Sequence, residues 1–330
     1  MDAGSELERR ASGGDADALC ELGVRSLASA ESPEAFAGGA AFVETAARQG
    51  HAEALCMLAT MEAIGAGRRQ DWHRAFDYLE LAADRGSGRA RAQLRLLGGG
   101  GSPEEGDGDV SAGAWRALRA RINVARLLQV PGRTAVSETP RMRVFEGFAS
   151  PAECRWVIET LRPRLGRAMV WDDATGLGRV DPNRSSSAVE LRLPVMDVLI
   201  EILRARISVA TRLPETIFEV PQVMHYSVGQ EFRTHHDYLD PQQQGPAADI
   251  ARRGQRIGTF LIYLNEDFEG GETVFPNAGF SYRGRTGDAL FFTNVTRDGG
   301  PDPLTLHAGL PPTSGEKWIF SQWIRDRAPG

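Results

Sequence analysis

The sequence has few cysteines, no long apolar run and no cluster of basic residues. Its three cysteines, Cys20, Cys56 and Cys154, are too sparse and odd in number for a secreted disulfide framework, so we expect three reduced thiols. No segment reaches the roughly 18 consecutive apolar residues of a membrane-spanning helix, and the first residues lack the apolar centre of a signal peptide. We therefore expect a cytoplasmic protein with no membrane partner.

The charge balance gives a second exclusion. The chain carries 38 Lys and Arg residues against 44 Asp and Glu residues, a formal net charge of −6 at pH 7. Because proteins bind nucleic-acid phosphates through clustered basic residues, we expect no nucleic-acid partner. The remaining composition, 42% hydrophobic and 25% charged, is typical of a globular protein, and 330 residues favour two domains over one.

The N-terminal part of the chain repeats. Gly14, Gly50 and Gly86 lie 36 residues apart and open three related segments, GDADALCELG, GHAEALCMLA and GSGRARAQLRLL. The helices expected before Gly50 and Gly86 each contain an Ala-Ala pair, which permits close packing, and each ends at the glycine. A period of this length predicts helical hairpins stacked as an α-solenoid over residues 1–97.

These hairpins resemble Sel1-type repeats, which are related to tetratricopeptide repeats. The resemblance implies a protein partner, whereas fewer than three complete copies fit, so repeats that only pack against the second domain are an equal alternative. The Gly-rich, acidic residues 98–109 predict a flexible linker. Apolar positions at helical spacing then predict a connecting helix over residues 112–129, and we assign residues 98–140 to linker and helix.

Beyond residue 140 the pattern changes to short apolar runs separated by Gly, Pro and Asp. Such runs predict the strands of an antiparallel sandwich or barrel, here with one helix at residues 151–161. The predicted fold class is therefore α+β and multidomain, with helical repeats followed by a β-rich domain over residues 141–330. The predicted strands lie within residues 218–228, 257–265, 288–295 and 317–325.

Three side chains suggest a metal site. His235 and Asp237 are two residues apart, and on a strand such positions share a face, whereas His236 would point away. The pair alone is a weak signal, but His307, just before a turn rich in Gly and Pro, offers a third ligand. Two histidines and one carboxylate form the facial triad of non-haem iron(II) oxygenases, which leaves three metal positions open.

Lys317 suggests an anion near that metal. It begins the apolar run KWIFSQWI, and a buried lysine without a counter-ion is costly. A dicarboxylate that chelates iron through its keto-acid end could reach Lys317 with its far carboxylate. Since alternate residues of a strand share a face, Lys317 and Trp323 should point the same way.

Several ordered segments between residues 143 and 325 carry a family resemblance: FEGFASPAEC, RSSS, YSVGQEFRTHHDY, GQRIGTFLIYLN, GGETVFP, GDALFF and LHAGLPPTSGEKWIFSQWI. They resemble the prolyl 4-hydroxylase family of 2-oxoglutarate oxygenases. The resemblance implies a double-stranded β-helix (jelly-roll) domain. It also implies Fe(II), 2-oxoglutarate and O2, with ascorbate as a reductant, and His235, Asp237 and His307 as the iron ligands and catalytic centre.

The resemblance also implies roles around the metal. Lys317 matches the residue that binds the distal carboxylate of 2-oxoglutarate, while Tyr226 and Thr273 match its neighbours in that pocket. Arg256 matches a substrate-contacting arginine, and Trp323 a tryptophan beside the target ring. Phe232 stands where peptide-hydroxylating relatives often have tyrosine.

The implied reaction is decarboxylation of 2-oxoglutarate to succinate with hydroxylation of a proline-like ring. We favour a prolyl residue in a peptide or protein. One alternative is a free amino acid such as proline or pipecolate in secondary metabolism, whose carboxylate would need Arg179, Arg184 or Arg325. Another is a non-catalytic interaction protein that acts through its repeats. The polar residues 240–255 would form a mobile loop over the pocket.

Overall fold

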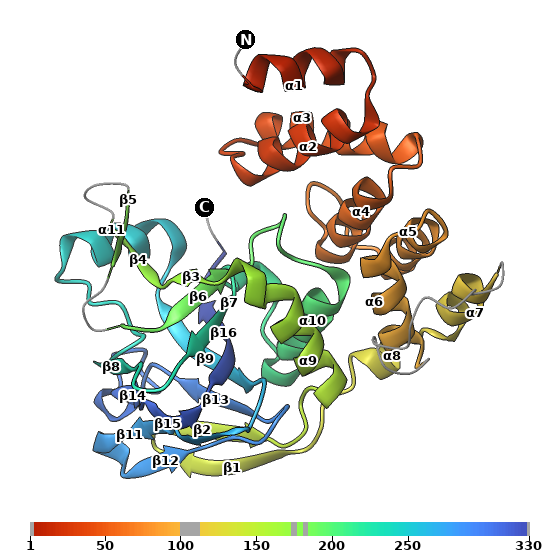
Figure 1. The fold of residues 1–330 in the computed structure, drawn as a ribbon. Helices are drawn as coiled ribbons and strands as arrows, with labels where there is room; N and C mark the ends of the chain where they lie inside the picture. The colour runs from red at the N-terminus through yellow and green to blue at the C-terminus, as the bar shows by residue number, and fades with distance from the viewer. Residues whose placement is uncertain (1–2, 100–112, 173–176, 181–183, 329–330) are drawn as a thin grey trace. The chain divides into compact units, whose positions relative to one another are not determined.

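The computed structural model describes residues 3–99, 113–172, 177–180 and 184–328, although not the side chains of residues 169–180 (Figure 1). The chain divides into two compact units. One contains Met1–Gln129 and Arg192–Leu203, and the other contains Val130–Leu191 and Arg204–Gly330. Among the described residues, no helix is both long enough and apolar enough to cross a membrane.

The first unit is helical, as its repeats predict. The equivalent residues Asp15, His51 and Ser87 each cap a helix by accepting a hydrogen bond from the backbone N–H three residues further on. Each cap follows a repeat glycine with φ between 82° and 91°, a conformation that favours glycine and accounts for Gly at these positions. The helices are α1 (Ala3–Ser12), α2 (Ala16–Ala28), α3 (Pro33–Arg48), α4 (Ala52–Ile64), α5 (Trp72–Asp84) and α6 (Gly88–Gly98).

The segment that follows the repeats differs from its prediction. In place of one helix over residues 112–129, the structure has α7 (Ala114–Arg121) and α8 (Val124–Leu127). The break occurs because the Asn123 side chain accepts the N–H of Arg126 and starts a new helix. Residues 100–109 of the predicted linker lie outside the described residues.

The second unit contains two main antiparallel sheets, which confirms the predicted α+β class and double-stranded β-helix. The larger sheet has the order β1-β2-β13-β9-β16-β7-β6-β3, and the smaller has the order β12-β11-β14-β8. Strand bounds in the larger sheet are β1 Arg133–Glu138, β2 Arg141–Phe145, β13 Ala289–Thr293, β9 Arg256–Tyr263, β16 Lys317–Arg325, β7 Gln222–Tyr226, β6 Ser187–Glu190 and β3 Gly166–Arg167. Those in the smaller sheet are β12 Phe280–Tyr282, β11 Thr273–Phe275, β14 His307–Gly309 and β8 Phe232–His235.

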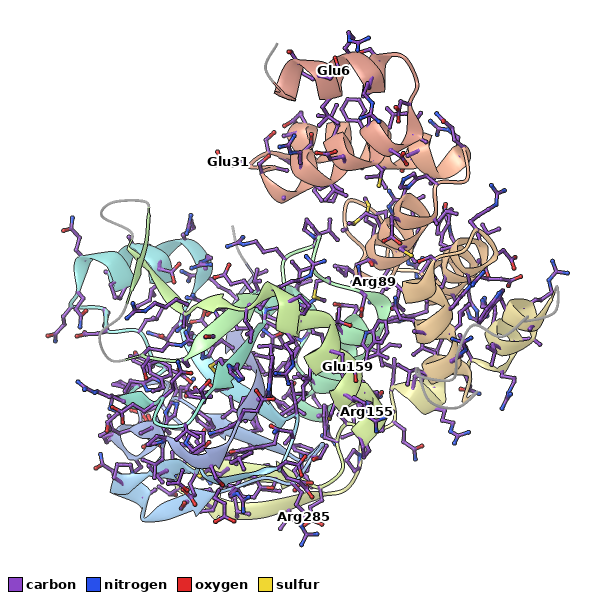
Figure 2. The ribbon with its side chains drawn as sticks, viewed as in Figure 1. Glu6, Glu31, Arg89, Arg155, Glu159 and Arg285 are labelled. Atoms are coloured by element: carbon purple, nitrogen blue, oxygen red, sulfur yellow. The ribbon has the colours of Figure 1, made fainter. Side chains whose placement is uncertain are left out.

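Two small hairpins and several helices complete this unit. The hairpins pair β10 (Phe268–Gly270) with β15 (Pro312–Gly315), and β4 (Met169–Asp172) with β5 (Leu177–Val180). Helix α9 has the predicted bounds, Pro151–Leu161; its exposed face carries Arg155 and Glu159, while Cys154 and Trp156 are buried (Figure 2). Helix α10 (Val198–Thr211) belongs to the first unit up to Leu203 and to this unit from Arg204. The other helical elements of this unit are α11 (Gln244–Arg253) and the short 3-10 turns η1 Arg162–Arg164, η2 Glu215–Ile217, η3 Pro276–Ala278 and η4 Pro303–Thr305.

Strand β16 runs through the middle of the larger sheet, between β9 and β7, and all nine of its residues are buried. Apolar and aromatic side chains of β7, β9, β16 and β11 form one core cluster, which includes Met224, Leu261, Phe275 and Ile319. The barrel interior is therefore apolar at the point where Lys317 enters it.

Candidate active site

The structure brings the three predicted metal ligands together. His235 is the last residue of β8 and pairs directly with His307, the first residue of β14. Nε2 of His235 lies 3.7 Å from Oδ1 of Asp237, and Nε2 of His307 lies 3.7 Å from Oδ2. One ligand atom from each residue lies within 4.8 Å of the other two. The spacing suits a single ion held between them.

Asp237 is not positioned beside the two histidines in the way that the sequence predicted. Strand β8 ends at His235, so Asp237 occupies a bend beyond the strand, and the face-sharing argument for the two residues is wrong. Its carboxylate is instead held by the hydroxyl of Thr259, 2.7 Å from Oδ2. His236, which also lies beyond β8, is exposed and is not part of the cluster, so its exclusion from the metal site agrees with the prediction although the alternation argument does not apply to it.

Hydrogen bonds at the far side of each imidazole orient the two histidines. Nδ1 of His235 lies 2.7 Å from the carbonyl oxygen of Arg233, and Nδ1 of His307 lies 3.0 Å from that of Thr305. A carbonyl only accepts, so each Nδ1 carries the proton and donates it. Each Nε2 therefore presents a lone pair to the space beside Asp237, as a metal ligand must.

Protonation of the cluster also suits a cation. Burial, reinforced by repulsion from His307, lowers the pKa of His235 to about 4, so its imidazole is neutral at pH 7. Burial opposes ionisation of Asp237, but favourable electrostatic interactions with the neighbouring His307, His235 and Arg256 side chains and the hydrogen bond from Thr259 outweigh it and hold the pKa of that carboxyl below its usual value. Neutral imidazoles and an ionised carboxylate are the forms that bind metals.

One cavity joins this cluster to Lys317. Lys317 is 1% exposed and donates to the carbonyl oxygen of Gly271 at 2.7 Å, while burial lowers its pKa to about 7. A Cβ added at Gly309 would lie 3.5 Å from Oη of Tyr226 and 3.9 Å from Nζ of Lys317, so the absence of a side chain keeps this space open. An anion here would restore the lysine's charge.

Tyr226 and Thr273 line the same cavity. The Tyr226 ring lies 5.2 Å from Nζ of Lys317, and Oγ1 of Thr273 accepts a hydrogen bond from the Tyr263 hydroxyl at 2.8 Å. The residues present therefore fit a carboxylate that enters between a cation and hydroxyl groups. Lys317 is also the only lysine in the sequence, a signal that composition alone could have given.

Two aromatic residues also line the cavity. Trp323 lines it together with Lys317, as strand alternation predicts. The Phe232 ring stacks on His235 with centroids 3.6 Å apart. The Arg256 guanidinium lies 4.0 Å from the Trp323 ring centroid and bonds both carboxylate oxygens of Glu219, at 2.6 and 2.9 Å. Arg256 is not among the described residues that line the cavity.

The three arginines considered for an amino-acid carboxylate are differently placed. The Arg325 side chain is 3% exposed and pairs with Glu219 at 2.6 Å and with Asp249 at 2.7 Å. Arg184 is also buried and donates to Ser186 and Gln222. The side chain of Arg179 lies outside the described residues.

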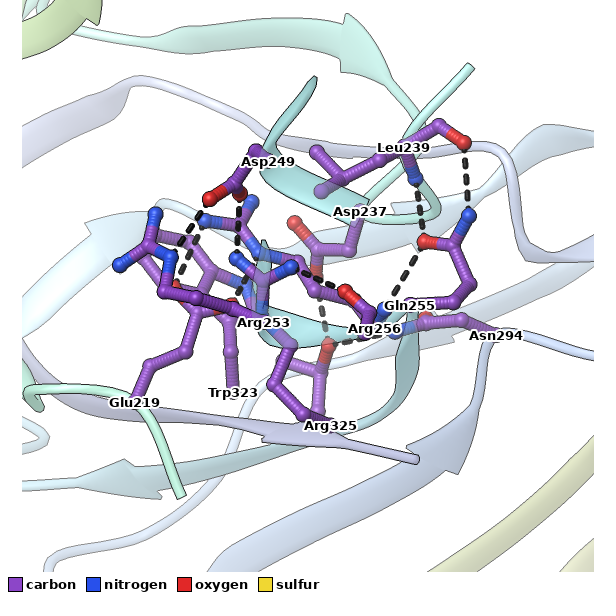
Figure 3. Close-up of polar contacts among 12 residues, drawn as sticks. Glu219, Asp237, Leu239, Asp249, Arg253, Gln255, Arg256, Asn294, Trp323 and Arg325 are labelled. Carbon is purple, nitrogen blue, oxygen red and sulfur yellow. Dashed lines mark hydrogen bonds and ion pairs between the residues drawn. The ribbon is translucent and has the colours of Figure 1, made fainter. Parts of the chain in front are cut away.

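A polar network beside Trp323 was not predicted (Figure 3). Gln255 bonds both the N–H and the carbonyl of Leu239, each at 2.8 Å, which fixes the chain two residues after Asp237. The polar members of this network are Glu219, Asp249, Gln255, Thr259 and Asn294. All except Asp249, which lies in α11, are polar residues within or next to apolar strands, and that contrast is the signal that could have identified them.

Comparison with known proteins agrees with this geometry. A sequence model of the 2OG-Fe(II) oxygenase superfamily matches residues 221–325, which include all three members of the cluster and Lys317. Prolyl 4-hydroxylase 1 of Arabidopsis thaliana is 36% identical over 211 residues, which cover 58% of this chain and 71% of that protein.

Two solved structures are also similar. The 2OG complex of viral collagen prolyl hydroxylase from Paramecium Bursaria Chlorella virus-1 is 28% identical with a TM-score of 0.43, covering 56% of this chain and 95% of that one. A Sel1 repeat protein from Oxalobacter formigenes is 26% identical with a TM-score of 0.28, covering 31% of this chain and 30% of that one.

The plant relative is matched over more than two-thirds of its length, and the superfamily match contains the clustered histidines, aspartate and lysine. Members of this group use Fe(II), 2-oxoglutarate and O2. The chain belongs to the prolyl 4-hydroxylase family of Fe(II)- and 2-oxoglutarate-dependent oxygenases.

Proposed function

We propose that this enzyme hydroxylates a prolyl residue in a peptide or protein, with His235, Asp237 and His307 as its iron ligands. The observation that carries the proposal is the convergence of two imidazoles and a carboxylate in one cavity with the buried amine of Lys317. Iron bound there would couple the oxidative decarboxylation of 2-oxoglutarate to the hydroxylation of a C–H bond.

In this proposal the chain positions the reactants. Lys317 binds the distal carboxylate of 2-oxoglutarate, with Tyr226 and Thr273 beside it, and the buried walls exclude water. Trp323 and Phe232, which line the same cavity, form the apolar surface for the substrate ring. Arg256 acts through Trp323, because its guanidinium contacts the Trp323 ring and donates a hydrogen bond to Glu219.

A peptide is favoured over a free amino acid by two considerations. Relatives at 34–36% identity are named prolyl 4-hydroxylases. A free amino acid would also need a cation for its own carboxylate, and Arg325 already pairs with two carboxylates of the protein. Meeting that need would require breaking a buried ion pair.

We also propose that the helical hairpins of residues 1–97 bind a protein partner or part of a polypeptide substrate. Residues 98–140 then act as the connection, and residues 141–330 as the oxygenase. The 36-residue period of capped helices supports this reading, since stacked hairpins offer an extended binding surface.

Mass spectrometry of the purified, Fe(II)-loaded enzyme tests the reaction. Proline-containing peptides and free amino acids are incubated separately, and substrate gaining one oxygen atom is compared with succinate released. We expect oxygen gain in peptides, matched by succinate, and neither product from Asp237→Ala, which lacks a metal ligand. Turnover of free amino acids alone would reject the peptide assignment, and full activity of Asp237→Ala would reject the proposed iron site.

A further inference from the structure

Asp237 is held by a short chain of buried hydrogen bonds (Figure 3). Oγ1 of Thr259, on β9, lies 2.7 Å from Oδ2 of Asp237, and Nδ2 of Asn294 lies 3.1 Å from the same hydroxyl oxygen. Thr259 and Asn294 are each 1% exposed, and Asp237 is 5% exposed. Water therefore does not compete for these bonds.

The chemistry of the three groups fixes the direction of the chain. A carboxylate only accepts hydrogen bonds, so the single hydroxyl proton of Thr259 is donated to Asp237. The Thr259 oxygen must then accept from its other neighbour, and only the amide nitrogen of Asn294 can donate. The order is therefore Asn294 N–H to Thr259 O–H to Asp237 carboxylate.

The outer end of the chain is anchored in the sheet. Asn294 follows β13, its backbone N–H donates to the carbonyl of Ile257 at 2.9 Å, and its own carbonyl accepts from the N–H of Asp302 at 3.1 Å. Thr259 is paired with Phe292 in the β9–β13 ladder. Both polar side chains are thus fixed by backbone bonds, whereas Asp237 lies in a bend past the end of its strand.

We propose that Thr259 and Asn294 are positioning residues that aim the Asp237 carboxylate at the metal. This inference rests on the proposed role of Asp237 as an iron ligand. This hydrogen-bond chain replaces the hydrogen bonds to water that the buried Asp237 carboxylate has lost. It also restricts rotation of the carboxylate, so the side chain needs less ordering when a cation binds.

Metal affinity tests the proposal without any turnover. The full-length wild-type protein and each variant are titrated with Co(II), and binding is followed by the visible absorption of the bound ion. Thr259→Val keeps the shape of the side chain without its hydroxyl, and we expect about 10–100-fold weaker binding. Thr259→Ser retains the hydroxyl and should restore binding close to the wild-type value. Thr60→Val, at a buried threonine that donates to the Cys56 carbonyl in the helical unit, is the matched control and should bind normally.

A second variant covers the case in which Thr259→Val fails to fold, as judged by circular dichroism. Asn294→Asp replaces the donor amide by an acceptor and draws the Thr259 proton away from Asp237, so Co(II) binding should again weaken. Wild-type affinity in either folded variant would overturn the inference. Failure of the wild-type protein to bind Co(II) would instead refute the proposed metal site itself.

Discussion

Lys317 combines a burial that is unfavourable for an amine with a position facing the metal cluster. Removing it as Lys317→Ala should weaken 2-oxoglutarate binding by roughly 10–100-fold, because one charge-assisted hydrogen bond is worth about 1.5–3 kcal/mol. Co(II) binding should be retained, since the amine is not a proposed ligand. Calorimetric titration of the Co(II)-loaded variant with 2-oxoglutarate measures the loss, and unchanged affinity would contradict the assigned role.

The pKa of Lys317 leads to a pH dependence. Burial lowers this pKa from the ordinary lysine value of 10.5 to about 7, so above pH 7 the amine is neutral before 2-oxoglutarate binds. The carboxylate must then bind together with a proton, and its affinity should fall by up to about tenfold per pH unit as the pH rises above 7. Below pH 7 the amine is already charged, and this group contributes no dependence.

Isotope-labelled lysine checks that prediction directly. Because Lys317 is the only lysine in the sequence, its side chain gives one NMR signal, which can be titrated with and without 2-oxoglutarate. The midpoint should lie near pH 7 in the free protein and higher in the complex. A midpoint near the ordinary lysine value in the free protein would show that the amine is not desolvated.

For individual residues, the sequence predicted which side chains form the site better than it predicted how they are positioned. Lys317 and Trp323 face one cavity, as alternation along one strand required. Asp237 did not follow such a rule, because β8 ends before it and a hydroxyl from β9 completes its placement. A bond between residues 22 apart depends on the tertiary fold, which periodicity cannot report.

Among the elements, α9 and α11 show when local signals suffice. For α9, Pro151 in the first turn and a capping box formed by Ser150 and Glu153 define the start, and the predicted bounds are confirmed. For α11 the loop prediction was wrong. Pro246 lies in the first turn, where proline is tolerated, and Gly254, at φ 81°, ends the helix. The same residues that suggested a loop are helix boundaries.

An ion pair between Asp249 and Arg325 joins helix α11 to the end of β16. Asp249 accepts from Arg253 at 2.5 Å and from Arg325 at 2.7 Å, and both Asp249 and Arg325 are buried. We expect Asp249→Ala to lower the free energy of unfolding by about 1.5–3 kcal/mol, since a buried charge-assisted bond is lost. Amide hydrogen exchange over residues 244–253 should quicken at the same time.

The matched control for that prediction is Arg252→Ala. The Arg252 side chain is 65% exposed and lies 3.8 Å from the same carboxylate, so its removal should change stability by less than about 0.5 kcal/mol. Equal exchange rates in wild type and Asp249→Ala would show that the ion pair does not hold the helix.

At the scale of the whole molecule, the chain is not divided in sequence order. Arg192–Leu203 belongs to the helical unit although it lies far beyond the repeats. Arg89 of α6 donates to the carbonyl of Met196 at 3.0 Å and lies 3.4 Å from the Asp197 carboxylate, which is 1% exposed and also accepts from the N–H of Ile200. A contiguous assignment could not anticipate this segment, because nothing in its own pattern resembles the repeat.

Arg89→Ala tests whether that segment stabilises the helical unit. The substitution removes a charge-assisted contact to a buried carboxylate and the hydrogen bonds to the carbonyls of Val195 and Met196, so the free energy of unfolding should fall by about 1.5–3 kcal/mol. Arg25→Ala, which breaks an exposed pair with Glu21, is the control and should cost under about 1 kcal/mol. Urea denaturation of the full chain measures both. Equal losses would mean that the Arg89 contact contributes no more than a surface pair, and the helical unit would then owe its stability to the stacked repeats themselves.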